Sequence, residues 1–304
     1  MTHPAIPRAV RNGRVVRPDE MTLPVTSTAV RHGLGAFETV GVRGGKAFLL
    51  GAHALRLVAS LSRAGWPCPW HPRTVFRWGS LAVGVAGRNE GVLRLIASPH
   101  GPTLFAWVDE AAGRDDGAAR AGGLRATVRP APRAPGSPLA GLKTLSWADH
   151  ARIRDRARAE GFDEVLLAAP DGALLEGTGA NLFLVENHGL VTPPAGEDVL
   201  PGVTRSLVSC LAPGLSLPLT IEPVSLPRLL SAGEAFLTNT LIGVAALVEV
   251  NGCPIGDGRP GPVTSRLRAS WWRLAQCTRT GEDAGEEMEE RPWAGKSPES
   301  ATAF

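Results

Sequence analysis

The hydrophobic and polar residues of the chain form short apolar runs, which are typical of strands, and longer segments with helical spacing. The apolar runs predict strands at 37–42, 46–50, 91–98, 124–128, 165–169, 173–175, 190–192, 234–240 and 243–250. Helical spacing predicts helices after residue 50, over 74–85, 146–160 and 261–277, and within 200–211. Both kinds of element therefore recur along most of the chain.

The length of 304 residues is enough for two domains, each with its own core. Residues 109–123 are rich in Gly, Ala and Asp, and we interpret them as the connection between the domains. The domains are accordingly expected at 1–115 and 116–278. Residues 279–304 are acidic and then rich in Pro and Ser, which predicts a disordered tail. The first 20 residues are expected to be a leader or a short edge strand.

Composition narrows the classes of function. Hydrophobic residues make up 43% and charged residues 20%, as in an ordinary globular protein, and the net charge of +3 is too small to indicate nucleic-acid binding. The longest apolar segment, 235–250, is too short and polar to span a bilayer, and the N-terminus lacks the apolar core of a signal peptide. We therefore expect a cytoplasmic protein with neither nucleic acid nor membrane as partner. Cys68, Cys210, Cys253 and Cys277 lack metal-ligand spacing, so no metal is expected and the four are predicted to be buried thiols.

The most informative segment is 162–183, which reads FDEVLLAAPDGALLEGTGANLF. Its apolar runs flank Pro170-Asp171-Gly172, a turn sequence, so the segment predicts a buried hairpin. Glu176 ends the second strand, where a carboxylate is costly to bury unless a cation or a hydrogen-bond donor meets it. The following Gly177-Thr178-Gly179 allows a ligand to approach the backbone closely. A surface glutamate before a loop is the alternative interpretation.

A second set of residues is suited to a phosphate. Pro201-Gly202-Val203-Thr204 stands where a helix is predicted to begin, and free backbone N–H groups and the helix dipole hold anions there. Thr204 adds a hydroxyl, and Thr240 adds another after a predicted strand. Arg56, one turn from His53 on the same side of a helix, could contribute a charge-assisted contact. Taken singly, these residues could equally be a helix cap, a strand-end hydroxyl and a solvated arginine.

Two cations lie in apolar surroundings. Lys143 is one of only three lysines and sits in a Leu-Lys-Thr-Leu segment, although a surface lysine at a helix start is the simpler interpretation. Arg94 lies inside an apolar run, where its charge needs a partner, and a buried arginine there could bind a carboxylate bidentately. His100 in the following loop is a weaker candidate for the same role.

Seven segments together resemble the class IV, or fold-type IV, pyridoxal-phosphate enzymes, which include branched-chain aminotransferases, D-amino-acid aminotransferases and 4-amino-4-deoxychorismate lyases. The segments span roughly residues 27–265 and are FET in HGLGAFETV, HALRL, LKTLSWAD, GFDEVLL, LLEGTGANLF, TPPAGEDVLPGVTR and EAFLTNTLIGVAALVEVNG. The resemblance implies an α/β (α+β) fold with a smaller N-terminal α/β sandwich and a larger domain whose mixed sheet is barrel-like. It also implies pyridoxal 5'-phosphate as cofactor and a homodimer in which the active site is completed across the two-fold axis.

The resemblance further implies roles for single residues. Lys143 would attach covalently to the cofactor and, once displaced by a substrate amine, act as general base or acid at the neighbouring carbon. Glu176 would pair with the pyridine nitrogen and keep it protonated, which makes the ring an electron sink. The matching phosphate-binding positions are Arg56, Val203 through its backbone N–H, Thr204 and Thr240.

The reaction depends on finer matches within the family. Thr238-Asn239-Thr240-Leu241 resembles the pattern of aminodeoxychorismate lyases, which form 4-aminobenzoate and pyruvate in folate synthesis, so this lyase is the leading expectation. The chain has no Tyr, and Ala148 stands where branched-chain aminotransferases carry one. In either reaction Arg94 and Asn239 are the expected substrate contacts. Because SPHGPTLF and VAALVEV depart from the lyase pattern, a branched-chain or D-amino-acid transaminase is the alternative. An inactive cofactor-binding protein is a third, which Lys143 and Glu176 disfavour.

Overall fold

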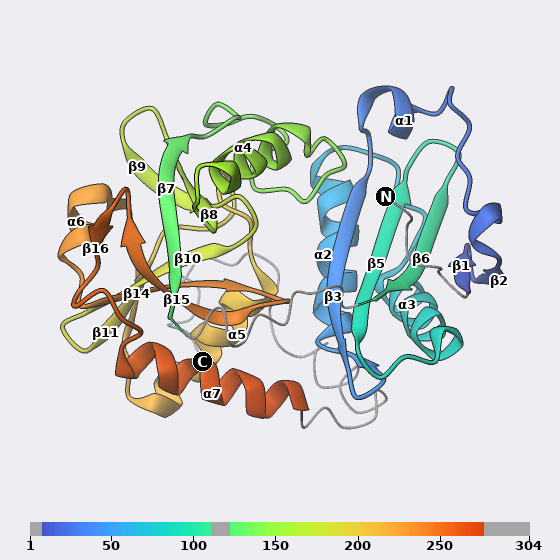
Figure 1. Ribbon diagram of the computed structural model, residues 1–304. Coiled ribbons are helices and arrows are strands. Elements are labelled where there is room, and N and C mark those ends of the chain that lie inside the picture. Colours follow the sequence, from blue (N-terminus) through green and yellow to red (C-terminus); the bar gives the residue numbers. More distant parts are fainter. Residues whose placement is uncertain (1–7, 111–121, 277–304) are drawn as a thin grey trace, which may run out of the picture.

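The computed structural model describes residues 8–110 and 122–276, which form two parts, each built on one sheet (Figure 1). The N-terminal sheet is antiparallel and has the strand order β2-β1-β6-β5-β3-β4. Its strands are β1 (Ala9–Arg11), β2 (Arg14–Val16), β3 (Ala36–Arg43), β4 (Lys46–Ala47), β5 (Gly91–Ser98) and β6 (Thr103–Asp109). The helices of this part are α1 (Thr28–His32), α2 (Leu50–Arg63) and α3 (Pro72–Ala86), with a short 3₁₀ helix η1 (Pro18–Glu20).

The two faces of this sheet have different environments. Side chains alternate along a strand, so Val40 on β3, Leu93 on β5 and Ala106 on β6 pack into one core with α2 and α3. The intervening residues Thr39, Arg94 and Trp107 are paired directly across the three strands and therefore share the opposite face. Glu38 alternates with Thr39 and consequently faces α2.

The C-terminal part contains a mixed ten-stranded sheet with the order β12-β11-β10-β14-β15-β7-β8-β9-β13, while β16 pairs with β15. Its strands are β7 (Leu124–Pro130), β8 (Glu164–Ala168), β9 (Ala173–Gly177), β10 (Asn181–Glu186), β11 (Gly189–Thr192), β12 (Leu219–Ile221), β13 (Val224–Ser225), β14 (Glu234–Asn239), β15 (Gly243–Val250) and β16 (Cys253–Pro254). Its helices are α4 (Ala148–Ala159), α5 (Val203–Leu211), α6 (Leu226–Ser231) and α7 (Pro262–Gln276), with a 3₁₀ helix η2 (Pro213–Leu215). Residues of α5 and α7 share a buried cluster with Phe183 and Phe236. This mixed α/β architecture is the predicted fold class.

Strand β3 joins the two parts at both of its ends. At its carboxyl end the Arg43 guanidinium carbon lies 5.0 Å from the ring centroid of Trp271 and 4.9 Å from that of Trp272. The Arg43 side chain also donates to the Leu241 carbonyl (3.2 Å). At the start of β3, the loop before α4 forms backbone hydrogen bonds from Phe37 N to Lys143 O (3.0 Å) and from Leu145 N to Gly35 O (2.9 Å). Lys143 is therefore placed against the N-terminal sheet.

Most predicted elements are present with small shifts of their ends, but two central strands were missed. Neither β6 nor β10 was predicted, and the predicted strand 46–50 ends at residue 47, where the turn into α2 begins. The edge-strand interpretation of the first 20 residues is correct for β2, whereas β1 lies inside the sheet between β2 and β6. The expected domain boundary at 115/116 and the tail 279–304 lie outside the described residues.

The prediction of buried thiols is wrong for Cys210 and Cys253, which are exposed, whereas Cys68 is half-buried and Cys277 lies outside the described residues. Within the described ranges, no helix is both long and apolar enough to cross a membrane. Nor do the same ranges contain a group of three or more His, Cys, Asp or Glu side chains that could hold a metal.

Candidate active site

Lys143 lies in the loop between β7 and α4, with its ammonium group among aromatic rings. Its Nζ is 4.2 Å from the ring centroid of Phe37 and 5.4 Å from that of Trp147. Burial lowers the pKa of Lys143 to about 8, and the charges of Arg56 and Arg94 act in the same direction against neighbouring carboxylates. About a tenth of the amine is therefore uncharged at pH 7, far more than for an ordinary lysine, and the uncharged form is the one that a nucleophile requires.

Arg133 stabilises the loop that carries Lys143. The Arg133 side chain donates to the carbonyl oxygens of Leu139 and Ser146, which lie on either side of Lys143 in the chain. Burial lowers the pKa of Arg133, so these acceptors offset part of the cost of placing its charge here. This arginine was not predicted as a site residue, because its partners are backbone atoms without a sequence signal.

Glu176, near the end of β9, is the second titratable group of the site. Its Oε1 accepts a hydrogen bond from Leu200 N (3.1 Å) and its Oε2 accepts one from Asn181 Nδ2 (2.9 Å). Burial raises the pKa of Glu176 to about 8, although the Leu200 N–H and the charge of Lys143 oppose this shift. A carboxylate so poorly solvated is suited to a cationic partner such as a protonated ring nitrogen.

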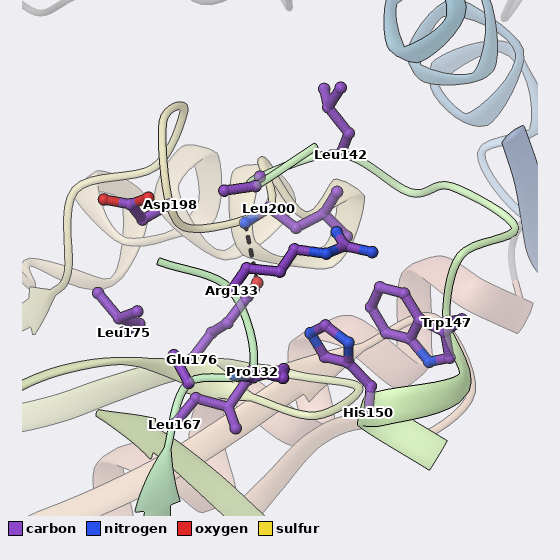
Figure 2. A pocket seen from close by; sticks show the side chains of 13 residues that line it. Pro132, Arg133, Leu142, Trp147, His150, Leu167, Leu175, Glu176, Asp198 and Leu200 are labelled. Carbon is purple, nitrogen blue, oxygen red and sulfur yellow. Dashed lines mark hydrogen bonds between the residues drawn. The ribbon is translucent and has the colours of Figure 1, made fainter. Parts of the chain in front are cut away.

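A small cavity of about 30 Å³ borders Glu176 on one side (Figure 2). Trp147 and His150 stack with 4.1 Å between ring centroids, and both line this cavity together with Arg133. Burial and the charge of Arg133 lower the pKa of His150 to about 4, so its ring is neutral at physiological pH. These groups form the wall of the site beside Glu176.

The N-terminus of α5 forms the candidate phosphate site. The helix begins at Val203 after Gly202, and no side chain caps its first N–H groups. A Cβ on Gly202 would lie 1.9 Å from Asn181 Oδ1, so only glycine fits beside the amide that also binds Glu176. Arg56 reaches this turn from α2, since its Nη1 donates to Pro201 O (3.2 Å). Thr204 is buried in the first turn of the helix.

Thr240 follows β14 and faces the N-terminal sheet. Its Oγ1 accepts a hydrogen bond of 3.5 Å from Gly41 N on β3. The structure therefore brings Arg56, Val203 and Thr204 together and places Thr240 at the junction with β3.

Arg56 is oriented by Glu38, a residue that the sequence analysis did not assign to the site. Both oxygens of Glu38 bind Arg56, at 2.7 Å from Nε and 2.8 Å from Nη2, and Oε2 also lies 2.7 Å from His53 Nδ1. Burial alone would raise the pKa of Glu38, but the charge of Arg56 and the further interactions with Arg56 and His53 together outweigh burial and hold the pKa well below its usual range. Burial lowers the pKa of His53, so its neutral ring donates through Nδ1. In the sequence, Glu38 stands out as a charged residue inside the apolar run 37–42, and this could have indicated a role in the site.

A second cavity, of about 270 Å³, lies at the N-terminal sheet and is bordered by Phe37 and Trp147, the two aromatic rings that surround Lys143 Nζ. Its lining combines one guanidinium residue and one acidic residue with apolar and aromatic groups: Phe37, Glu38, Arg94, Leu95, Ile96, Trp107, Leu145 and Trp147. Arg94 donates from Nη1 to Thr39 Oγ1 (2.8 Å) and from Nε to Asp109 Oδ2 (3.0 Å), so the partner that its charge required is Asp109.

The two other predicted substrate contacts lie in turns. Asn239 Oδ1 accepts hydrogen bonds from Leu241 N and Ile242 N (both 2.9 Å), and its Nδ2 donates to Gly179 O (3.0 Å). Its amide therefore shapes the turn between β14 and β15. His100 Nδ1 lies 3.1 Å from Thr28 Oγ1, in the loop between β5 and β6.

These groups fit pyridoxal phosphate, because they offer an amine for its aldehyde, a carboxylate for its ring nitrogen and an uncapped helix N-terminus with an arginine for its phosphate. The site thus defines a pyridoxal-phosphate-dependent enzyme. The chain matches the amino-transferase class IV family over residues 35–250, and it belongs to that family.

Relatives and solved structures agree with this assignment. The "Putative branched-chain-amino-acid aminotransferase" of Methanocaldococcus jannaschii is 27% identical over 273 residues, which cover 84% of this chain and 92% of that protein. The branched-chain-amino-acid aminotransferase of Escherichia coli K12 is 34% identical over 122 residues, or 40% of each chain. A hypothetical aminotransferase from Mycobacterium tuberculosis, in its PLP-bound form, superimposes with a TM-score of 0.78 at 25% identity and covers 88% of this chain and 98% of its own. The branched-chain aminotransferase of Thermoproteus uzoniensis with norvaline shares the fold, with a TM-score of 0.81 at 24% identity, covering 95% of this chain and 98% of its own.

Proposed function

We propose that the protein is an amino-acid transaminase whose substrate side chain occupies the 270 Å³ cavity beside Lys143. The observation that carries the proposal is the lining of this cavity, where the guanidinium of Arg94 stands among aromatic and aliphatic groups and the one acidic residue, Glu38, has both of its oxygens bound by Arg56. Its volume is near the lower end of the range of about 300–1,000 Å³ that is typical of small-molecule sites. The transaminase names of the relatives support the same reaction.

In the proposed reaction, each side chain around Lys143 has a separate role. Lys143 would hold the cofactor through its Nζ, and the same Nζ would take and return the proton at the substrate carbon that bears nitrogen. The rings of Phe37 and Trp147 exclude water around that Nζ. When bound, pyridoxal phosphate supplies an electron-withdrawing ring that accepts the electron pair released at this carbon. Glu176 holds a proton on the ring nitrogen, and Asn181 orients Glu176.

The phosphate is assigned to one set of donors: Arg56, the Val203 N–H, Thr204 and Thr240. Arg56 enters this set through its Nη1, because Glu38 occupies its other two nitrogens. Arg94 is assigned to the substrate carboxylate, for which its charge-assisted hydrogen bonds are suited.

A 4-amino-4-deoxychorismate lyase is the second candidate, since Thr238-Asn239-Thr240-Leu241 favours it. The case for this lyase depends partly on Asn239 as a substrate contact. In the structure, however, Asn239 Oδ1 accepts from its own turn and its Nδ2 donates to Gly179 O. We therefore rank the transaminase first.

A single-turnover experiment separates the candidates. The holoenzyme is mixed with a panel of L- and D-amino acids while the visible absorbance of the cofactor is recorded, and pyruvate release from aminodeoxychorismate is assayed in parallel. A transaminase converts the cofactor rapidly with at least one amino acid. Pyruvate release without such conversion would instead establish the lyase, and neither signal would indicate an inactive binding protein.

Arg94→Gln gives the matched test of the substrate site. The variant should weaken amino-acid binding by about 1.5–3 kcal/mol, the value expected for hydrogen bonds to a charged group. Arg88→Gln is the control, because Arg88 is also partly exposed and paired with one carboxylate, Glu110, but does not line the cavity. Equal losses in both variants would contradict the assignment.

We also propose that the protein is a homodimer, as the family resemblance implies. Two apolar side chains before and within α1 are markedly exposed, Val25 at 79% and Val30 at 55%, and burial against a second copy would remove them from water. Sedimentation of an active, strictly monomeric enzyme would contradict this proposal. A cytoplasmic location stays a prediction.

A further inference from the structure

The 30 Å³ cavity beside Glu176 is lined by a histidine whose ring has an unpaired buried nitrogen. His150 lies in the first turn of α4 and is only 8% exposed. Its ring points into the cavity, toward Arg133 and Glu176 (Figure 2). Nδ1 of this ring is buried and has no hydrogen-bond partner within residues 8–110 and 122–276. Because buried polar atoms are as a rule hydrogen-bonded, the position of this ring requires a physical reason.

The other charged groups at this cavity already have partners. Glu176 is bound by backbone and amide N–H groups, and Arg133 donates from both terminal nitrogens to atoms of the loop that carries Lys143. Asp198 Oδ1 accepts from Gly136 N (3.2 Å). His150 is therefore the polar side chain of this wall that a ligand can engage without breaking a hydrogen bond described above.

The neutral ring of His150 has one proton to donate. Burial and the charge of Arg133 lower the pKa of His150 to about 4, so one of its two nitrogens carries hydrogen and the other does not. Since Nδ1 has no acceptor beside it, the proton is better placed on Nε2, at the end of the ring that is farthest from the backbone. The His150 ring thus presents an N–H group to the cavity.

Trp147 connects this wall with Lys143. Its ring centroid lies 5.4 Å from Lys143 Nζ and 4.1 Å from the centroid of the His150 ring, and Trp147 also lines the cavity beside Glu176. The four residues assigned to the phosphate do not line this cavity. In pyridoxal phosphate, the ring edge opposite the phosphate arm carries a hydroxyl group, between the aldehyde carbon and the ring nitrogen. With the aldehyde at Lys143 and the nitrogen at Glu176, that edge would face Trp147 and His150.

We propose that His150 is a further cofactor-binding residue, which donates its Nε2–H to the ring hydroxyl oxygen of pyridoxal phosphate. Such a donor stabilises the ionised form of this oxygen, because hydrogen bonds to a charged acceptor are the stronger ones. Stacking at an interplanar angle of 12° against Trp147 holds the imidazole in one orientation. The contact concerns the cofactor alone, so it applies to a transaminase and to a lyase equally.

The test compares two ligands that differ only in the ring hydroxyl. Calorimetry measures the affinity of the cofactor-free protein for pyridoxal phosphate and for 3-deoxypyridoxal 5'-phosphate, which lacks that group. His150→Phe retains a flat ring against Trp147 and removes both nitrogens. This variant should bind pyridoxal phosphate about tenfold more weakly, through loss of one hydrogen bond to a charged oxygen, and the deoxy analogue with less than about a twofold change. His150→Gln, whose side-chain amide can donate an N–H in place of Nε2, should keep most of the preference for pyridoxal phosphate.

Two control variants isolate the role of His150. His100→Phe makes the same exchange in the loop between β5 and β6, away from this cavity, and should leave both affinities unchanged. Trp147→Phe removes the indole N–H from the same wall and should change both affinities by the same factor. Thermal unfolding shows whether each variant is folded.

Two outcomes would overturn the proposal. One is an equal loss of affinity for both ligands in a folded His150→Phe variant, and the other is a preference for pyridoxal phosphate that depends on Trp147 rather than on His150. Because the experiment measures binding without turnover, its result is independent of the single-turnover assay. A failed transamination assay would therefore contradict the proposed function and leave the role of His150 to be decided by the two affinities.

Discussion

Substitution of Glu38 by Gln should destabilise the protein far more than the loss of an ordinary surface ion pair. Glu38 is fully buried, and its two oxygens are bound by Arg56 Nε, Arg56 Nη2 and His53 Nδ1 at 2.7–2.8 Å. Gln keeps one acceptor oxygen but turns an amide toward Arg56, which leaves the guanidinium without its counter-charge. Breaking a buried pair by removing one partner costs about 3–5 kcal/mol.

The expected loss can be measured by urea and thermal unfolding of the cofactor-free protein. At about 2–4 °C per kcal/mol, the melting temperature should fall by roughly 6–20 °C. Glu160→Gln is the control, because Glu160 also binds two groups, Arg129 and Arg156, but is 35% exposed. Its loss should be about 1 kcal/mol or less.

The pH dependence of the same experiment gives a second check. The pKa of Glu38 in the folded protein lies well below its usual range. The stabilisation is therefore fully present above the unfolded pKa of about 4 and is lost as the pH falls below it. The difference between the wild type and Glu38→Gln should shrink below about pH 4. A loss no larger than that of Glu160→Gln, or a difference that is constant down to about pH 3, would refute the reasoning.

Three further predictions concern the cofactor site. Lys143→Ala should abolish turnover, while cofactor still binds through its phosphate. Borohydride reduction of the wild type, followed by peptide mass analysis, should find the adduct on Lys143. An adduct on Lys46 or Lys296 would contradict the assignment. Because the pKa of Lys143 is lowered to about 8, the rate at which the visible band forms in cofactor-free protein should rise with pH to a midpoint near 8, and a midpoint near the ordinary lysine value of about 10 would contradict the burial of the amine. The pKa of Glu176 is raised to about 8, so its contribution to stability is largest below about pH 4 and is lost as the pH rises through 8. In the cofactor-free protein, the free energy of unfolding should therefore fall with pH between about pH 5 and 8. Glu176→Gln should remove this part of the pH dependence.

Local patterns predicted much of the fold. The hairpin of β8 and β9 follows from two apolar runs around Pro170-Asp171-Gly172, and the start of α5 follows from Pro201-Gly202. In both cases, the residues that decide the conformation are neighbours in the sequence. The same segments carry Glu176 and Val203, which is why these two could be named from the sequence.

Contacts between distant segments could not be predicted in this way. Glu38 and Arg56 come from a strand and a helix that meet only in the folded protein, so the carboxylate that orients Arg56 had no local signature. Likewise the partner of Arg94 is Asp109 on β6, a strand that was not predicted. Asn239 carries a recognisable pattern, but the pattern does not distinguish a substrate contact from the amide of a turn.

The two backbone hydrogen bonds between the Lys143 loop and the start of β3 have a consequence for protein engineering. Phe37 N and Gly35 O bind this loop; Phe37 lies on β3 and Gly35 directly precedes it, whereas Lys143 and Leu145 belong to the C-terminal part of the chain. A chimera that exchanges one part with a relative therefore alters the contacts that position the Lys143 loop, even when every cofactor contact is retained. Crossovers near the connection should be tolerated only when segments 35–37 and 143–145 are inherited from the same parent.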